Sequence, residues 1–514
     1  MSGGRLYPSL EHYSTLAADA PPTARIPLWR RLTVSDPFDA YRAARRGTDG
    51  VFLETTGGQS GWGYFCVDPV ERLTARAPAV PRSAGSSPSL AALTGILENE
   101  SLVRDACPVP YPCGLFGWFS YDLARELEAI PETSTDDRDV PQLQVGLFDR
   151  VVAWREPRTS PSTPVYVVAC PRVSDDPTES YLRGRNRIDE LREAMRTDVP
   201  ARAVPTNAAS ATFVSECGRS SYAERVKRIK RYIREGDTFQ VNISHRLAAP
   251  ATVSSVAVYD ALRQVNPAPY SGILEFPGIE LVSASPELLL SIEGDSLSTE
   301  PIAGTRPRGA TPQEDAALEA ELLSDEKERA EHAMLVDLER NDVGKVATYG
   351  SVTVREYRRV DRYSEVMHLV SRVDGRLRPD VSLAGVARAD PLTPADSTPA
   401  DRLCAAIAAV FPGGTITGAP KPRTMEIIEE LETTRRGPYT GSMGMIGFDA
   451  RATLNIIIRT IVRTGDEFHL RVGAGIVHDS VPDREYDETM DKARALITAL
   501  DEALGAAADW ELAT

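Results

Sequence analysis

The sequence predicts an α+β fold in which strands and helices come in groups. Segments with a period of two lie together over residues 269–306 and again over 442–476, separated by glycine turns, while amphipathic helical segments are collected between and after them. Strands and helices that do not alternate one for one argue against a doubly wound parallel sheet. A chain of 514 residues can form about three units of roughly 150 residues each. We nevertheless expect one dominant domain.

Charge and hydropathy limit the partners of the chain. The formal net charge is −16, and a diffuse negative field repels phosphate, so we expect no nucleic-acid partner. A small anionic substrate would need a local basic pocket. The start MSGGRLYPSL lacks a basic-then-apolar signal pattern, and no run of 18 apolar residues occurs. We therefore expect no membrane partner and a cytoplasmic location.

The six cysteines are dispersed along the chain without any CxxC pair. Neither a zinc ribbon nor a disulfide framework fits this spacing. We expect reduced, buried thiols.

The chain divides into two regions at a segment rich in proline and small polar residues, 196–210. We expect residues 1–205 to form a β-rich N-terminal lobe. A short helix is predicted in DPFDAYRAARR, and strands are predicted in VFLETT, WGYFCVDP and GLFGWFSYDL. Residues 206–514 form the second and larger region.

The second region opens with a helix in SSYAERVKRIKRYIREGD, for which Ser221 can cap the start and Gly236 the end. TFQVNISHRL then reads as a strand with Gln240, Asn242 and Ser244 on one face. A single apolar strand is predicted in LNIIIRTIV. Residues 380–401 are predicted to form an irregular surface loop.

Two predicted helices each present carboxylates at helical spacing. Glu328 and Glu331 are three residues apart, and Glu485, Glu488 and Lys492 share a face of the closing helix. Carboxylates from two helices suit Mg²⁺, which takes one or two protein carboxylates together with water and substrate oxygens. The alternative is a pair of solvated faces, Glu485 included.

Arg459 lies in the apolar stretch LNIIIRT, where an unpaired guanidinium would be costly. It either meets an anion or forms an internal bridge to an aspartate. His368 and His332 are each compatible with a satisfied core position. The glycine turns in FPGGTITGAPK and RVGAGIVHDS expose backbone N–H groups that suit carboxylate capture, and the first lacks the spacing of a nucleotide-binding P-loop.

The motifs ASPE, PIAGTRPRG, ERAEHAMLVDLERND, GGTITGAPK, IIIRT, GAGIV and DETMDKA occur in the order found in chorismate-utilising enzymes. The chain resembles the large synthase subunit shared by anthranilate synthase and aminodeoxychorismate synthase, closely over residues 215–503. The resemblance implies a large sandwich of two antiparallel β-sheets flanked by helices, with chorismate and Mg²⁺ in the cleft between the sheets.

The same resemblance implies roles for single residues. Glu331 and Glu488 would coordinate Mg²⁺, with Glu328 acting through water and Glu485 beside them. Glu287 would be the general acid that protonates the departing 4-hydroxyl group, and His368 would lie near the ring. The residues that would bind substrate are Gln240, Gly304, Thr305, Thr415, Tyr439, Arg459, Gly473, Gly475 and Lys492.

Gln240 stands where family members that add water carry a lysine base. A neutral amide cannot deprotonate water, so ammonia is the expected nucleophile. No cysteine sits in a G-x-C-x-G nucleophile elbow. The resemblance therefore implies a separate glutamine amidotransferase subunit that supplies ammonia.

The resemblance leaves two reaction products open. RRGPYTGSMGMIGF and GWFSYDLARELEAIP favour 4-amino-4-deoxychorismate, the precursor of 4-aminobenzoate and folate, and this is the reading we prefer from sequence. Ala303, in a position where many aminodeoxychorismate synthases carry lysine, and YSEVMH favour the alternative, anthranilate plus pyruvate for tryptophan synthesis. FLETT replaces the LLES of tryptophan-regulated members, so the resemblance gives little support to tryptophan feedback. The resemblance leaves open that the N-terminal lobe contains a regulatory pocket.

A third alternative, from another class, is a non-catalytic paralogue serving as a scaffold. The chain retains every residue that the resemblance places in catalysis, which disfavours this reading: Glu287, Glu331, His368, Arg459, Glu488 and Lys492.

Overall fold

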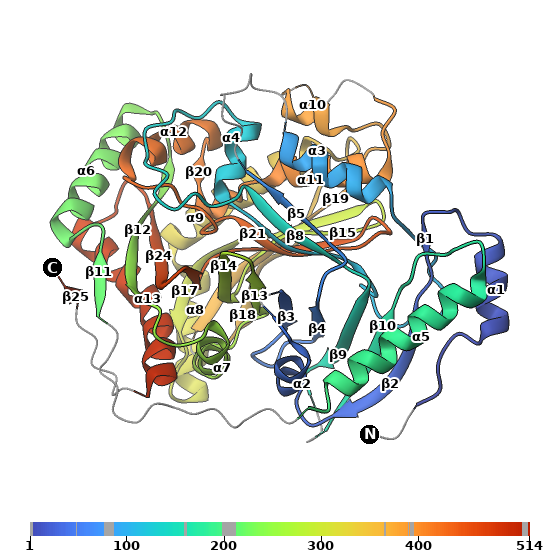
Figure 1. Ribbon diagram of the computed structural model, residues 1–514. Coiled ribbons are helices and arrows are strands. Elements are labelled where there is room, and N and C mark those ends of the chain that lie inside the picture. The colour runs from blue at the N-terminus through green and yellow to red at the C-terminus, as the bar shows by residue number, and fades with distance from the viewer. Residues whose placement is uncertain are drawn as a thin grey trace.

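Two large antiparallel β-sheets and flanking helices make up the chain in the computed structural model (Figure 1). The structure describes residues 4–47, 49–76, 87–158, 162–197, 212–363, 366–388, 390, 395–505 and 512–513. The predicted fold class is confirmed. The predicted boundary at residue 205 lies outside the described residues.

The larger sheet has 13 strands within the described residues, antiparallel except for the β11–β25 pair. In spatial order they are β2 (Leu28–Val34), β10 (Thr163–Ala169), β9 (Arg150–Glu156), β4 (Gly61–Val67), β3 (Gly50–Glu54), β13 (Tyr270–Phe276), β14 (Ile279–Ser285), β23 (Thr460–Thr464), β24 (Glu467–Ile476), β12 (Gln240–Pro250), β11 (Phe213–Ser215) and β25 (Leu512–Ala513), with β20 (Gly418–Ala419) paired to β12.

The smaller sheet has 10 strands in the same part of the chain. Their order is β17 (Ile302–Pro307), β19 (Val366–Arg376), β16 (Ser296–Glu300), β15 (Leu288–Glu293), β22 (Ala452–Ile456), β21 (Ser442–Ile446), β7 (Gly114–Phe119), β8 (Leu143–Phe148) and β5 (Glu71–Ala75), with β18 (Thr353–Arg362) paired to β19. A separate parallel pair joins β1 (Ala24–Arg25) and β6 (Ser101–Leu102).

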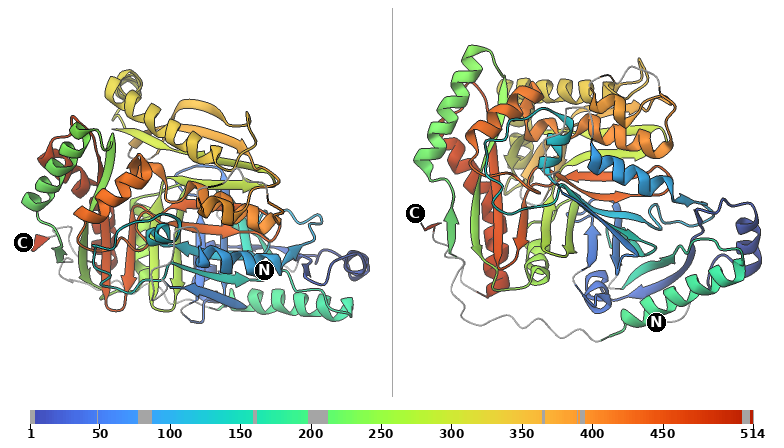
Figure 2. Two further views of the ribbon diagram at one scale, coloured as in Figure 1. Left: turned by 90° about the horizontal axis from the view of Figure 1, so that it is seen from above. Right: turned by 45° about the horizontal axis from the view of Figure 1, so that its top comes forward.

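The helices flank these sheets, with the α8–α9 segment beside β17 and β19 on one flank and α6 and α13 on another (Figure 2). They are α1 (Leu10–Ala18), α2 (Pro37–Ala44), α3 (Pro88–Glu98), η1 (Tyr121–Leu123), α4 (Ala124–Leu127), α5 (Pro177–Ala194), α6 (Arg219–Glu235), α7 (Ser255–Val265), α8 (Pro312–Ser324), α9 (Glu326–Gly344), α10 (Leu383–Ala387), α11 (Pro399–Val410), η2 (Gly414–Ile416), α12 (Lys421–Leu431) and α13 (Pro482–Leu504). No described helix is both long and apolar enough to cross a membrane.

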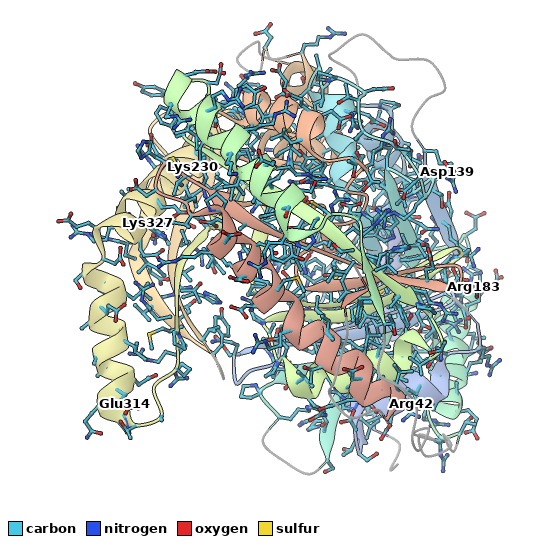
Figure 3. All side chains as sticks on the ribbon, turned by 90° about the vertical axis from the view of Figure 1, so that its left-hand side faces the viewer. Arg42, Asp139, Arg183, Lys230, Glu314 and Lys327 are labelled. Atoms are coloured by element: carbon cyan, nitrogen blue, oxygen red, sulfur yellow. The ribbon has the colours of Figure 1, made fainter. Side chains whose placement is uncertain are left out.

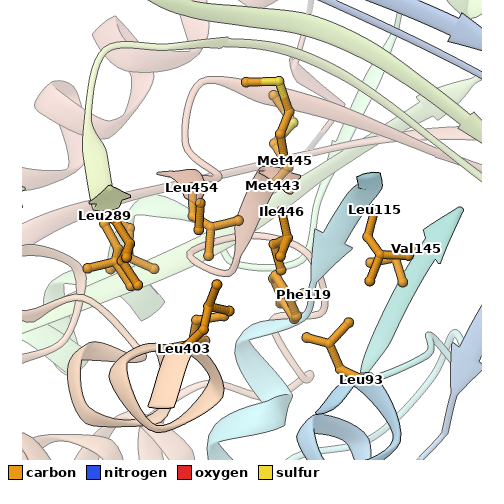
Figure 4. Packing of buried hydrophobic residues seen from close by; sticks show 14 of the residues in the cluster. Leu93, Leu115, Phe119, Val145, Leu289, Leu403, Met443, Met445, Ile446 and Leu454 are labelled. Carbon is orange, nitrogen blue, oxygen red and sulfur yellow. The ribbon is translucent and has the colours of Figure 1, made fainter. Parts of the chain in front are cut away.

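Both sheets contain strands from the two predicted regions. In the larger sheet β3 pairs with β13, and in the smaller sheet β7 pairs with β21. The main apolar core covers the smaller sheet, where Leu93 of α3 and Leu403 of α11 pack toward Phe119, Leu289 and Met443 (Figure 4). One continuous core of this kind holds strands from distant parts of the sequence in one frame.

Several local predictions are corrected. The α6 helix begins after Gly218, so Ser221 lies inside it, whereas Gly236 ends it with φ 85° as expected. The segment 380–401 contains the short helix α10 and the start of α11. All six cysteines are buried, as predicted, and none is joined in a disulfide in this structure.

The stretch LNIIIRTIV is not one strand. It supplies β22 to the smaller sheet and β23 to the larger one, and the chain crosses between the sheets at residues 457–459. Arg459 occupies the crossover with φ 48°, in the left-handed region that non-glycine residues rarely adopt. The crossing places its side chain between the two sheets.

Candidate active site

A cavity of about 620 Å³ lies between the two sheets. Its walls come from β12 and β24 of the larger sheet, from β17 and β19 of the smaller one, and from α9 and α13. Figure 3 looks from the side of α6 and α13 and labels Lys327, which lines this cavity from α9. The cavity is large enough for a drug-sized ligand.

Most of the predicted site residues line this one cavity. The eleven that do so are Gln240, Gly304, Thr305, Glu328, Glu331, Thr415, Arg459, Gly475, Glu485, Glu488 and Lys492. The remaining four lie directly behind its wall. Glu287 accepts a bond from the Ile302 N–H, and His368 bonds Thr305. Tyr439 lies against Gly473, where an added Cβ would come within 2.8 Å of the Tyr439 hydroxyl oxygen.

Glu331 is the central carboxylate of the cavity. Gln240 Nε2 donates to Glu331 Oε1 over 2.8 Å. Burial, followed by the charge of Glu328, raises the pKa of Glu331 to about 7. Burial also raises the pKa of Glu485. These carboxylates repel one another, so a cation placed among them would be stabilised.

The four carboxylates come from two helices, as predicted from their spacing. Each of the other members has its own contact: Arg306 Nη1 lies 3.2 Å from Glu328 Oε1, and Lys492 Nζ lies 2.7 Å from Glu488 Oε1. Among the described residues no group of three or more His, Cys, Asp or Glu side chains is close enough to enclose a metal ion. The set still fits Mg²⁺, because that ion is usually held by one or two carboxylates and completes its shell with water and substrate oxygens.

Arg459 presents an uncompensated cation to the cavity. No ion pair joins its guanidinium to a carboxylate among the described residues, so the expected alternative of an internal Arg–Asp bridge is not found there. Burial lowers the pKa of Arg459, yet arginine stays protonated at any working pH. A half-buried guanidinium without a carboxylate partner is suited to bind a carboxylate.

His368 is buried beside the cavity. Its Nδ1 lies 2.9 Å from Thr305 Oγ1, and its Nε2 has no hydrogen-bond partner in the part of the chain that the structure describes. Burial, followed by the charge of Arg459, lowers the pKa of His368 to about 3, so the imidazole is neutral. His332, by contrast, is fully buried, and its Nε2 lies 2.6 Å from Ser371 Oγ. It is a hydrogen-bonded residue of the protein interior.

Glu287 is a buried acid in the turn between β14 and β15. Its Oε1 lies 3.4 Å from the Ile302 nitrogen, and its carbonyl accepts from the Ile456 N–H at 3.0 Å. Burial raises the pKa of Glu287 to about 8, opposed by the Thr415 hydroxyl and by the Ile302 N–H. The carboxyl is therefore protonated at neutral pH and able to donate a proton.

Two glycines permit close approach at the cavity wall. Gly304 has φ 92°, and a Cβ there would lie 3.2 Å from Glu328 Oε2. A Cβ on Gly475 would lie 2.5 Å from Gln240 Nε2. A side chain at either position would displace the polar groups of the site.

The structure adds lining residues that the sequence did not single out, notably Asn242, Asn266 and Lys327. Asn242 Oδ1 is buried and has no hydrogen-bond partner among the described residues. The alternation that placed Gln240 and Asn242 on one face of a strand could have identified it. Lys327 lacked such a signal, because it is one cation in a charged helix.

A second cavity, of about 440 Å³, lies under the N-terminal strands. Glu54 and Thr55 of the FLETT segment line it together with Tyr270, Met443 and Asn455. Both oxygens of Glu54 are held by Arg263 at 2.8 Å. Tyr363 and Ile302 border this cavity, close to His368 and Glu287 of the first.

Comparison with known proteins gives concordant matches. Anthranilate synthase component 1 3 of Haloarcula marismortui is 60% identical over 497 residues, covering 96% of this chain and 94% of that protein. Aminodeoxychorismate synthase component 1 of Bacillus subtilis is 43% identical over 392 residues, covering 76% of this chain and 77% of its own. The crystal structure of anthranilate synthase component I from Streptococcus pneumoniae superposes with a TM-score of 0.71 at 28% identity, covering 85% of this chain and 92% of that one.

A sequence profile described as chorismate binding enzyme matches residues 50–498, which is most of the chain and includes every residue of the cavity wall described above. The protein is an enzyme of the chorismate binding family.

Proposed function

We propose that the protein is component I of an anthranilate synthase, which converts chorismate and ammonia to anthranilate, pyruvate and water. The observation that carries the choice of product is the 60% identity over 96% of the chain to a protein named anthranilate synthase, against 43% over 76% for one named aminodeoxychorismate synthase. Our sequence-based preference for 4-amino-4-deoxychorismate is therefore replaced by its alternative. Ala303, which lines the cavity without a nucleophile, agrees with this choice.

Chorismate carries two carboxylates, and the cavity offers a partner for each. Arg459, which has no carboxylate partner among the described residues, would bind the enolpyruvyl carboxylate, with Tyr439 and the Gly475 backbone beside it. Glu331 and Glu488, with Glu328 and Glu485 next to them, would hold Mg²⁺ near the ring carboxylate. Bound there, Mg²⁺ would supply positive charge to that carboxylate.

Glu287 would donate its proton to the 4-hydroxyl group, which leaves as water while ammonia forms a bond to C2. The pKa of about 8 keeps this proton available at neutral pH. Loss of the C2 proton and departure of the enolpyruvyl group as pyruvate then give the aromatic ring. His368 fits the acceptor of that proton, because its imidazole is neutral and its Nε2 is unoccupied among the described residues.

Ammonia would come from a glutamine amidotransferase subunit. The component 1 naming of the relatives agrees with a second component, and no cysteine of this chain lies in a nucleophile elbow. We keep residues 1–205 as a proposed lobe that contributes the second cavity, with 206–514 as the catalytic region, and we assign that cavity no ligand.

The test is incubation of the purified protein with chorismate, Mg²⁺ and an ammonium salt, followed by chromatography with fluorescence detection. We expect anthranilate and pyruvate in equal amounts. A non-aromatic amino product that yields 4-aminobenzoate only after a lyase is added would overturn the proposal. Consumption of glutamine by the protein alone would contradict the separate amidotransferase.

A further inference from the structure

Glu339 of α9 is a buried carboxylate outside the cavity. Only 4% of the residue is exposed, and both oxygens accept hydrogen bonds from separate segments. Gly414 N–H donates to Oε1 over 3.1 Å, and Thr299 Oγ1 donates to Oε2 over 3.0 Å. A buried acceptor with two such donors fixes both segments to the helix.

Each of these two segments carries a residue that lies beside Glu287. Gly414 begins η2, and its neighbour Thr415 lines the cavity and opposes the raised pKa of Glu287 through its hydroxyl. Thr299 lies in β16, three residues before Ile302, whose N–H meets Glu287 Oε1 at 3.4 Å. Glu339 therefore joins two segments that lie next to the Glu287 carboxyl.

Charged groups among the described residues act on both of these acids. Asp342 of the same helix and Lys421 of α12 face Glu339, and Lys421 Nζ bonds Asp342 and the Val410 carbonyl, the latter at 3.0 Å. Burial and the Asp342 charge raise the pKa of Glu339, while Lys421 and the Gly414 N–H favour its ionised form. Of the charged groups near Glu287, Glu339 raises its pKa and Arg459 lowers it.

We propose that Glu339 is a positioning residue that sets both the placement and the protonation of the Glu287 carboxyl. When Glu339 is ionised, its charge disfavours a negative charge on Glu287, which lies in the same dry interior. The two hydrogen bonds of Glu339 fix the segment that carries Thr415 and the strand that precedes Ile302, whose N–H meets Glu287 Oε1. The inference rests on the proposed function, in which Glu287 donates a proton.

The discriminating variant is Glu339→Gln. The amide oxygen can still accept from Gly414 and the amide nitrogen can donate to Thr299 Oγ1, so the geometry is kept while the charge is lost. We expect the alkaline decline of kcat, which requires protonated Glu287, to move to lower pH by about 0.5 to 1 unit. Asp337→Asn, on an exposed side of the same helix, is the matched control and should not move it.

An alkaline decline that stays in place, or a loss of activity that is equal at every pH, would overturn the inference. Thr299→Val supplies a second variant if the first does not fold, because it removes one hydrogen bond and keeps the charge. We expect it to lower kcat about 3- to 10-fold without moving the decline. An unchanged kcat in this variant would also contradict the inference.

Titration of the Glu287 carboxyl by infrared difference spectroscopy separates this inference from the proposed function. Glu287→Gln identifies the carboxyl band, and no turnover is needed. A band that titrates at lower pH in Glu339→Gln supports the inference even if no anthranilate forms, in which case only the proposed function fails. A band that titrates at the same pH in both proteins overturns the inference even if the enzyme is active.

Discussion

Gln240 of the larger sheet and Glu331 of α9 meet across the cavity, with 2.8 Å between Nε2 and Oε1. The amide joins a strand to a helix of the opposite wall, and it favours the ionised form of a carboxyl whose pKa burial raises to about 7. In the proposed function, this ionised carboxylate would bind Mg²⁺.

Removal of the Gln240 amide should therefore weaken the response to Mg²⁺. In Gln240→Leu the Glu331 carboxyl loses its donor, which costs about 1 to 3 kcal/mol, equivalent to about 5- to 150-fold in an equilibrium constant. We expect a higher Mg²⁺ concentration at half-maximal rate, measured by titrating the rate at fixed chorismate. Gln264→Leu, on an exposed position of α7, is the control. An identical Mg²⁺ curve would remove the proposed link between Gln240 and the cation.

Glu488→Gln should abolish Mg²⁺-dependent turnover. The exchange removes one of the two carboxylates proposed for the ion, together with the Lys492 ion pair at 2.7 Å. We expect kcat/KM to fall at least about 100-fold, the scale of a lost metal ligand or its support. The neighbouring Asp487→Asn breaks an exposed pair with Arg219 and should leave turnover unchanged. An active Glu488→Gln enzyme would contradict the metal assignment, and chelation of Mg²⁺ should stop the unmodified enzyme.

Arg459→Met should stabilise the fold and weaken the binding of chorismate. A guanidinium without a carboxylate partner is costly to bury, so its replacement is expected to raise the free energy of unfolding by about 1 kcal/mol. The same change should raise KM for chorismate about 10- to 100-fold, because the substrate carboxylate loses its partner. Denaturant unfolding and steady-state kinetics measure the two effects. Arg463→Met, which breaks an ion pair to Glu280, should leave KM unchanged. An unaltered KM in Arg459→Met would refute the assignment.

The contribution of the buried histidines to stability should decline as the pH falls below about 6.5. Burial lowers the pKa of His245, His368 and His469 to about 3 and that of His332 to about 4. Between these values and the ordinary value near 6.5, the unfolded chain binds protons that the folded chain does not, so the unfolding free energy falls with pH. Each histidine contributes at most about 1.4 kcal/mol per pH unit.

His469→Gln tests this contribution away from the cavity, since His469 lies near the start of β24 and bonds Thr464 at the end of β23. The variant should show a smaller slope of unfolding free energy between pH 6.5 and 4, measured by denaturant titration at several pH values. His478→Gln, in an exposed position, should keep the original slope. Equal slopes in all three proteins would show that buried neutral histidine does not govern acid stability here.

Sequence reasoning located the cavity better than it located single elements. Glu328 with Glu331 and Glu485 with Glu488 could be paired from helical spacing alone, and the structure brings all four to one cavity. Arg459 was placed in a strand because IIIRT is uniformly apolar on both sides. Periodicity cannot reveal that a chain leaves one sheet for another, since the residues before and after the crossover are equally buried.

The pKa values of the site residues could not be predicted from the sequence either. Glu287 and Glu331 differ little from other glutamates in local context, and only burial by segments far away in the chain separates them from solvent-exposed ones. The start of α6 shows the opposite limit: Gly218 and Ser221 are both acceptable caps, so the boundary is uncertain by a few residues.

The pairing of β3 with β13 and of β7 with β21 means that neither half of the chain closes its own sheets. A fragment that begins near residue 212 would leave one exposed edge on each sheet, with a row of unpaired N–H and C=O groups ready to capture another chain. Such a fragment would aggregate unless residues 4–197 were supplied beside it. Coexpression of the two pieces would then restore a soluble assembly without a covalent link.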